Sequence, residues 1–305
     1  MNYPIPSQSF SRHIAILILL GVGCTFASAH IAARIAFDNN TGLLTAVLFR
    51  SGLSLTLLGV IALWFRQSLR ISWRLTPWQL ALGLLIAIQS ISIYSAVARV
   101  PVGIALLVVN TFPVQLALIT WALGGKRPSR STSILMGVIL IGLLLALDIP
   151  SLLQSDISNM QQWVIGIGFA LLAAFSFAIG LWVIEHKIKA INGITRSFYT
   201  MLAVLIICAV AGYLGVMPGG LTLPANALGW GMLLLLASLY ALGFITLFIL
   251  TPRLNLGQNA PAMNMEPIAS LFLGWVILGQ HLSPIQIVGG VVVVGCIVAL
   301  SYIKE

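Results

Sequence analysis

Asparagine stands three residues before proline at two places in the chain, Asn110 before Pro113 and Asn264 before Pro267. Both pairs fall inside apolar runs long enough to cross a bilayer. A buried asparagine needs a hydrogen-bond partner, and a proline inside a helix leaves a backbone carbonyl without its usual donor. Because Asn264 follows Asn110 by 154 residues, about half the chain, we expect a duplicated protein with a polar binding site between its halves and a hinge at each proline.

Arg50 and Glu266 are the charged residues that lie well inside apolar runs. A charge at the bilayer centre costs about 2.5–3.5 kcal/mol on insertion scales, so each must face protein or water. Arg50 is either a fixed cation that receives a substrate carboxylate or a structural arginine that bonds helix carbonyls. Glu266 is an anchor for a substrate ammonium group, a proton carrier, or a neutral or paired acid that bonds the carbonyl freed by Pro267. Thr111 and Phe112 offer no matching acid in the first half.

Several uncharged polar side chains are further candidates for the site. The amides of Asn110 and Asn264 donate and accept, which suits the carboxylate and amine of a zwitterion, but they also suit bonds between helices. Tyr94 and Tyr240 would hold an aromatic or apolar cargo and keep a hydroxyl for a polar partner, or would simply pack. His30, inside the first apolar run, is a titratable group or a helix-packing one. Gln89 and Ser238 belong to the same two runs as the tyrosines.

Motifs of the common enzyme classes are missing from the sequence. It has no HExxH, no Walker loop and no GxSxG, and its three cysteines have no metal-ligand spacing. We therefore expect no catalytic residues, no metal, no cofactor and no direct use of ATP. An intramembrane enzyme that modifies lipids or headgroups would need at least two convergent acids or histidines, and the sequence offers one buried acid.

The composition is that of an integral membrane protein. Sixty per cent of the residues are hydrophobic and 7% are charged, with a mean hydropathy of +1.08, whereas soluble domains carry about 25% charged residues. A spanning helix takes about 20 residues. The sequence predicts an all-α protein with ten spans, near residues 12–36, 43–65, 77–98, 101–123, 132–149, 163–185, 194–216, 227–250, 257–279 and 284–303.

The net charge of +9 is distributed as a topology signal. With the N-terminus inside, 12 of the 15 basic residues fall in inside loops, two in outside loops and one, Arg50, within a span. The positive-inside rule therefore predicts that both termini are cytoplasmic. The basic loops would meet anionic lipid headgroups, and this distribution does not favour nucleic acid as a partner.

The sequence also contains an internal repeat. Residues 137–147 resemble 290–300, residues 98–100 resemble 252–254, and the first and sixth spans share a short echo at an offset of 151. We predict a first five-helix unit at 1–150, a linker at 151–162 and a second unit at 163–305. Because five is odd, the second unit enters from the opposite side, which makes an inverted repeat. Five glycines would permit close helix contact between the halves: Gly137, Gly142, Gly289, Gly290 and Gly295.

With these features the chain resembles the ten-helix EamA-type exporters of the drug/metabolite transporter superfamily. The resemblance rests on Pro113 and Pro267, on Leu278 to Ser283 before Gly289 and Gly290, and on Arg50 in the second span. It covers residues 14–149 and 163–303 as two EamA-like units. The family usually has glutamate after the glycine between its fourth and fifth helices, where this chain has Lys126 and Gln280.

The resemblance implies a secondary transporter of the bacterial inner membrane, monomeric or a homodimer. It would export small metabolites, foremost amino acids or related zwitterions and with aromatic amino acids as one branch, by alternating access. Protons are candidate coupling ions. A lipid-modifying enzyme and a membrane sensor or assembly subunit without flux remain the alternatives.

Overall fold

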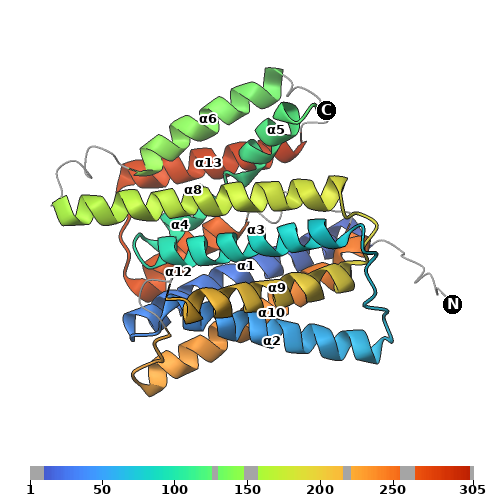
Figure 1. Cartoon of the computed structure of the whole chain (residues 1–305). Coiled ribbons are helices and arrows are strands. Elements are labelled where there is room, and N and C mark those ends of the chain that lie inside the picture. Colours follow the sequence, from blue (N-terminus) through green and yellow to red (C-terminus); the bar gives the residue numbers. More distant parts are fainter. Residues whose placement is uncertain (1–9, 126–129, 148–156, 216–220, 255–264, 303–305) are drawn as a thin grey trace.

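The computed structural model describes residues 10–125, 130–147, 157–215, 221–254 and 265–302, and its regular structure in these ranges consists of helices. Figure 1 shows them packed together in one bundle. The helices of the first half are α1 (Arg12–Asp38), α2 (Leu43–Trp64), α3 (Thr76–Val97), α4 (Val102–Val109), α5 (Phe112–Ala122) and α6 (Arg130–Leu147). Those of the second half are α8 (Ile157–His186), α9 (Gly193–Tyr213), α10 (Ala227–Leu254), α12 (Met265–Leu278) and α13 (Pro284–Tyr302).

These helices lie where the apolar runs predict spans. In the described ranges, seven helical segments are long and apolar enough to cross a membrane, and three shorter apolar helices account for the remaining runs. The prediction of an all-α membrane protein is therefore confirmed at the level of its helices. The side of the membrane on which each terminus lies stays a prediction.

The fourth predicted span, 101–123, is two helices rather than one. α4 ends at Val109, and α5 begins at Phe112 with Pro113 in its first turn. Proline has no N–H, and its ring clashes with the carbonyl four residues earlier, so it is accommodated at the start of a helix and not in the middle. The chain bends at the residues between, Asn110 and Thr111.

Two other boundaries differ from the expected ones. α8 begins at Ile157, so the last six residues of the stretch expected as a linker, 157–162, are helical. α12 begins at Met265, with Pro267 in its first turn as Pro113 is in the first turn of α5. The first part of the predicted ninth span, up to Asn264, lies outside the described residues.

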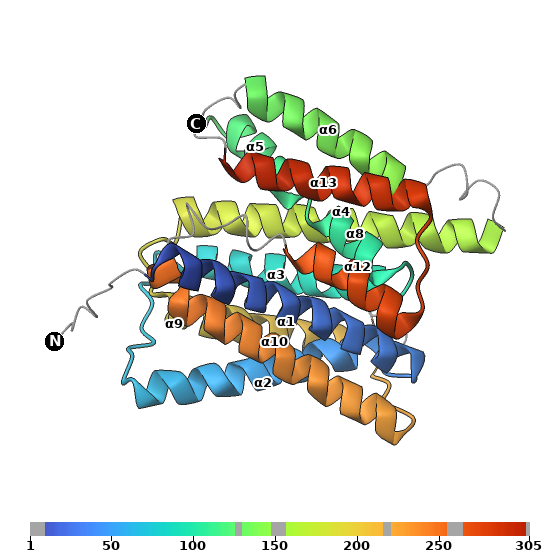
Figure 2. The same ribbon diagram turned by 180° about the vertical axis from the view of Figure 1, so that it is seen from behind.

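Helix packing is reciprocal between the two halves. The first helix of each half packs against the third helix of the other, which pairs α1 with α10 and α8 with α3. The first helix also packs against the fourth of the other half, α1 against α12 and α8 against α4 and α5. The second helices pack against each other, as do the last ones, α6 and α13 (Figures 1 and 2). Such exchange of partners is what a twofold relation between two similar units produces.

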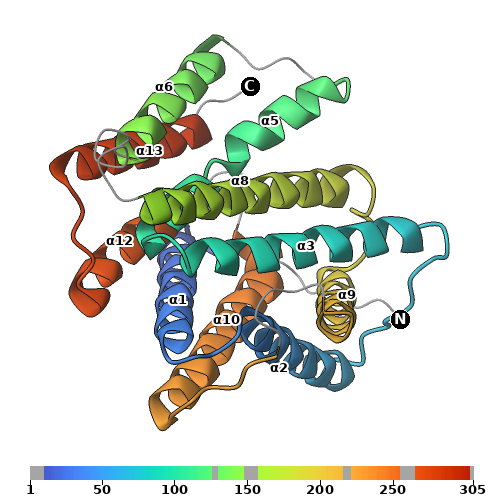
Figure 3. The same cartoon turned by 60° about the vertical axis from the view of Figure 1, so that its left-hand side comes forward.

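The α6–α13 pair shows how closely small residues let helices approach (Figure 3). A Cβ atom added to Gly289 would lie 2.2 Å from the backbone nitrogen of Ala146 and 2.5 Å from the carbonyl oxygen of Gly142. Gly142 itself faces Val292. The prediction that glycines allow close contact is therefore right for Gly142 and Gly289. It is wrong for Gly137 and Gly295, where an added Cβ would meet nothing within 4 Å.

Candidate functional site

Arg50 is the most deeply enclosed charged side chain of the described core. It lies on α2, is 1% exposed, and is reached by side chains of α3 and α10. Its Nη2 donates to Ser90 Oγ at 2.5 Å and its Nη1 donates to the Tyr94 hydroxyl at 3.3 Å. The guanidinium carbon lies 3.8 Å from the ring centre of Tyr240 and 5.0 Å from that of Tyr94. The arginine thus fixes two tyrosines from different halves.

Among the described residues, no carboxylate lies within ion-pair distance of Arg50. Burying an unpaired charge costs several kcal/mol, and a desolvated cation–π contact returns about 2 kcal/mol. The Nε atom is buried without a hydrogen-bond partner. The side chain therefore supplies a positive potential to its surroundings, while Tyr94 and Tyr240 separate it from any ligand in this conformation.

His30 and Glu266 form a second polar contact, across α1 and α12. The His30 Nε2 atom lies 3.5 Å from Glu266 Oε1, with side-chain exposures of 6% and 23%. The imidazole also meets the Tyr94 ring edge to face, with centroids 5.9 Å apart. Its Nδ1 atom is buried with no hydrogen-bond partner. Glu266 is thus the more accessible member of the pair, and the imidazole keeps one polar edge unused.

Together these residues form what we call the central polar cluster: His30, Arg50, Ser90, Tyr94, Tyr240 and Glu266. It runs from carboxylate to imidazole to phenol to guanidinium and draws on five helices of both halves. Three phenylalanines line it, with ring centroids 5.7 Å away in each case: Phe26 and Phe244 against Tyr240, and Phe37 against Tyr94. The cluster thus places a carboxylate at one end and a guanidinium at the other, with aromatic rings between them.

The residue equivalent to Glu266 in the other half makes an apolar contact. Phe112 of α5, which stands where Glu266 stands in the repeat, meets Phe177 of α8 edge to face at 4.9 Å. Phe177 corresponds in turn to Phe26 of α1, one helical turn before His30. Leu181 stands at the same offset from His30. Neither the acid nor the imidazole therefore has a polar counterpart, so the polar site is asymmetric.

Asn110 serves the end of α4. Its Nδ2 donates to the Leu106 carbonyl at 2.8 Å, and Thr111 Oγ1 donates to the Val108 carbonyl at 2.7 Å. Both carbonyls also accept a backbone N–H, from Asn110 and Thr111 respectively, so the side-chain bonds are second bonds to acceptors in the last turn of α4. Asn110 is 7% exposed, and its amide nitrogen is used locally. Asn264, its expected counterpart at the site, lies outside the described residues.

The structure brings Arg50, Tyr94, Tyr240 and Glu266 into one cluster. It also places His30 there, a residue that the sequence left open as either a titratable group or a helix-packing group. The signal for His30 was its position as a histidine inside an apolar run. Gln89 lies beside Ser90 with a 3.4 Å contact between side-chain oxygens. Ser238 is exposed on the surface of α10 and does not belong to the cluster.

Hydrogen bonds between the halves tie both ends of the molecule. At one end, Thr45 Oγ1 donates to the Thr222 carbonyl at 2.6 Å. At the other, Thr195 Oγ1 donates to the Ser68 carbonyl at 3.1 Å. Each threonine is the third residue of the second helix of its half, so the two bonds are counterparts.

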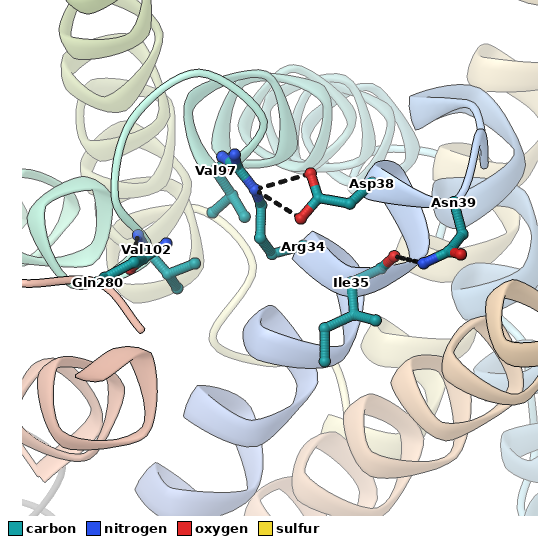
Figure 4. Close-up of polar contacts among 7 residues, drawn as sticks. All are labelled: Arg34, Ile35, Asp38, Asn39, Val97, Val102 and Gln280. Atoms are coloured by element: carbon teal, nitrogen blue, oxygen red, sulfur yellow. Dashed lines mark hydrogen bonds and ion pairs between the residues drawn. The ribbon is translucent and has the colours of Figure 1, made fainter. Parts of the chain in front are cut away.

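A further link lies near the first of these ends (Figure 4). The backbone N–H of Val102, at the start of α4, donates to Gln280 Oε1 at 3.3 Å. Beside it, Arg34 bonds the Val97 carbonyl at 2.9 Å and pairs with Asp38 at 3.2 Å. These contacts join the segment before α4 to the α12–α13 loop and to α1.

A groove of about 610 Å³ lies elsewhere, between α12 and α13. Its walls are mostly apolar side chains, several of them exposed, such as Phe272, Trp275 and Val291. It contains no member of the central polar cluster, and its lining suits lipid chains. In the part of the chain that the structure describes, no group of three or more His, Cys, Asp or Glu residues is placed to hold a metal ion.

Comparison with solved structures supports the fold. One of them, described only as "Crystal structure of protein", matches with a TM-score of 0.62 at 19% identity, over 96% of this chain and 98% of that one. At this identity the similarity concerns the fold alone. No curated protein matches the chain.

The sequence model of the EamA-like transporter family matches twice, at residues 13–147 and 164–302. The two matches confirm that the chain carries two copies of one unit, and they cover most of its length. They agree with the reciprocal helix packing and with the apolar helices of an integral membrane protein. The chain belongs to the EamA-like transporter family, a group of membrane transporters of the drug/metabolite type.

Proposed function

We propose that the protein exports small zwitterionic metabolites, amino acids foremost, across the bacterial inner membrane by alternating access. The observation that carries this proposal is the central polar cluster, in which an accessible acid and an enclosed cation lie at opposite ends of an aromatic-lined site. A zwitterion carries the complementary pair of charges. Buried charges in a membrane protein mark substrate or ion pathways as a rule.

In this proposal Glu266 receives the substrate ammonium group, and Tyr94 and Tyr240 contact its apolar part. Arg50 attracts the carboxylate through its positive potential. Direct contact with Arg50 requires Tyr94 or Tyr240 to move, because the guanidinium is enclosed by them. The asparagines, Asn110 and Asn264, complete the polar wall when the fourth and ninth spans rearrange.

Alternating access follows from two inverted units that exchange conformations. The hinges are at Pro113 and Pro267, each in the first turn of a helix that contacts the other half or the site. The bonds from Thr45 and Thr195 close opposite ends, so that opening one end breaks one bond and leaves the other. Both termini face the cytoplasm, and transport runs downhill or is coupled to an ion such as a proton or to a counter-substrate.

Counterflow in proteoliposomes tests the proposal. Vesicles that contain purified protein and an excess of one unlabelled amino acid inside should take up the same labelled amino acid transiently, and protein-free vesicles should not. Labelled glycerol serves as a neutral control solute. Absence of counterflow across a panel of neutral, acidic, basic and aromatic amino acids would contradict the proposed substrate class.

The same vesicles separate the two other functions. A lipid-modifying enzyme would change the headgroup composition of the vesicles without moving the label. A sensor or assembly subunit would do neither and yet bind ligand with a measurable dissociation constant. Neither outcome is expected here, because the described site has a single acid, in contact with one imidazole, and draws its side chains from both repeated units.

A further inference from the structure

Two loops from different halves meet at one end of the molecule. The α2–α3 loop (residues 65–75) and the α8–α9 loop (residues 187–192) lie together at the right-hand side of Figure 1. This end is opposite to the one that contains Thr222 and Gln280. The sequence predicts that it faces the cytoplasm.

The α2–α3 loop is held by two hydrogen bonds from α9. Thr195 Oγ1 donates to the Ser68 carbonyl at 3.1 Å, and the Tyr199 hydroxyl donates to the Leu69 carbonyl at 2.9 Å. These bonds fix the backbone directly before Arg70. The α2–α3 loop is therefore tethered to the second half of the chain.

Apolar packing holds the loops to each other as well. Ile188 and Ile191 of the α8–α9 loop are buried in a cluster with Leu82 and Val183. Ile71 and Leu75 of the α2–α3 loop pack against the same cluster. Because these apolar residues face the cluster, the basic residues near them in sequence are left exposed on the surface of the two adjoining loops.

We call this surface the basic platform and define it by five exposed residues: Arg66, Arg70, Arg74, Lys187 and Lys189. The two loops contain no aspartate or glutamate. The nearest acid along the chain is Glu185, which is exposed at the end of α8. The positive-inside rule accounts for basic loops, but it does not require cations from two halves on one tethered surface.

Aromatic rings place the platform at the level of lipid headgroups. The Lys187 Nζ atom lies 4.9 Å from the ring centre of Trp78 and 5.5 Å from that of Trp182. Trp64 and Trp73 are 81% and 79% exposed at the same end. Tryptophans of this kind concentrate at the membrane–water interface. Cations beside such rings suit a ligand with an anionic head and an apolar tail.

We propose that the basic platform binds the headgroup of an anionic phospholipid, with the two phosphates of cardiolipin as the best match to cations on two loops. Arginine binds phosphate oxygens with its planar fork, and lysine does so as a point charge. Basic surfaces of this kind on the cytoplasmic side recognise such headgroups. A lipid bound here bridges the two halves and favours the conformation in which this end is closed.

Native mass spectrometry of the full chain tests the proposal. The protein is transferred into detergent with equal amounts of cardiolipin and phosphatidylcholine, and the bound lipids are counted. Wild-type protein should retain cardiolipin in preference. The double variant Arg74→Gln/Lys187→Gln should retain it about tenfold less. Arg130→Gln, which removes an exposed charge at the start of α6, should retain it as the wild type does.

Two results would overturn the proposal. One is equal retention of phosphatidylcholine and cardiolipin by the wild type. The other is wild-type retention of cardiolipin by the double variant, or a loss per removed charge in Arg130→Gln as large as in the double variant, which would mean that binding follows net charge alone. Thermal midpoints in lipid-free detergent verify that the variants are folded. If Arg74→Gln/Lys187→Gln does not fold, the double variant Arg70→Gln/Lys189→Gln replaces it. The readout needs no transport, so the outcome is independent of the substrate.

Discussion

Arg50 shows how one buried side chain organises the site. Its guanidinium bonds Ser90 and Tyr94 and lies over Tyr240, so three helices depend on its planar, multiply donating shape. An ammonium group has neither the fork nor the flat face. The role of Arg50 in this conformation is therefore to position the two tyrosines.

Replacement by lysine tests that role while it keeps the charge. We expect Arg50→Lys to lower the free energy of unfolding by roughly 1–3 kcal/mol, because the stacking and one hydrogen bond are lost. The thermal midpoint in detergent should fall by several degrees, while Arg130→Lys on the surface should leave it unchanged. An Arg50→Lys protein as stable as the wild type would mean that charge alone matters there.

For individual residues, the sequence predicts which charged side chains are buried but not which side chains contact them. Arg50 and Glu266 stand out because burial of a charge in a membrane is costly. His30 does not, since a lone histidine has no spacing to identify it and its partner comes from another helix. Asn110 shows the opposite limit, because the same amide that suits a zwitterion also suits the carbonyl of Leu106 one turn earlier.

The packing of the helices against one another depends on small residues at their contacts. α6 and α13 approach so closely at Gly289 that a Cβ atom there would meet backbone rather than a movable side chain. On the same two helices, Gly137 and Gly295 face open space. Alanine substitutions at Gly289, Gly137 and Gly295 therefore add the same methyl group to the same two helices, at one crowded and two open positions.

We expect Gly289→Ala to separate α6 from α13 and to lower the thermal midpoint by several degrees, as overpacking costs about 1–3 kcal/mol. Gly137→Ala and Gly295→Ala should be neutral or slightly stabilising, since alanine is the better helix former. Thermal unfolding in detergent compares all three. Equal midpoints for Gly289→Ala and the controls would show that the two helices do not pack as described.

Helix positions could be predicted within a few residues because about 20 apolar residues are needed to cross a bilayer. Prolines at 113 and 267 mark where the fourth and ninth spans are weak. The sequence does not show that α4 ends completely before α5 begins, because the break depends on how Asn110 and Thr111 bond back to the last turn of α4 through their backbone and side chains. The close contact at Gly289 could not be predicted from the sequence either, since it depends on which face of a helix packs against its neighbour.

The whole molecule is a pair of similar units whose contacts are exchanged between them. Three echoes at offsets of 151 to 154 made the duplication predictable from sequence. Which helices pair could not be predicted, because apolar faces of membrane helices look alike. The counterpart bonds of Thr45 and Thr195 at opposite ends are the clearest product of this pairing.

If the two ends open in turn, the two threonines should act in opposite directions. Thr45→Val should speed hydrogen exchange in the backbone around residues 221–226 and slow it in the α2–α3 loop. Thr195→Val should do the reverse, because weakening one closed end shifts the population toward the state that keeps the other closed. Thr56→Val, which removes an exposed hydroxyl of α2 bonded within its own helix, is the control. Faster exchange at both ends in either variant would indicate loosening without exchange between two states.

The central claim, that a zwitterionic substrate is held at the polar cluster through Glu266, is tested most directly by counterflow in proteoliposomes with two matched glutamate variants. We predict that Glu266→Gln lowers the initial rate at least about tenfold, the usual cost of one lost contact to a charged group. Glu185→Gln, an exposed acid at the end of α8, should transport at the wild-type rate. Wild-type flux in Glu266→Gln would contradict the account, whatever the substrate proves to be.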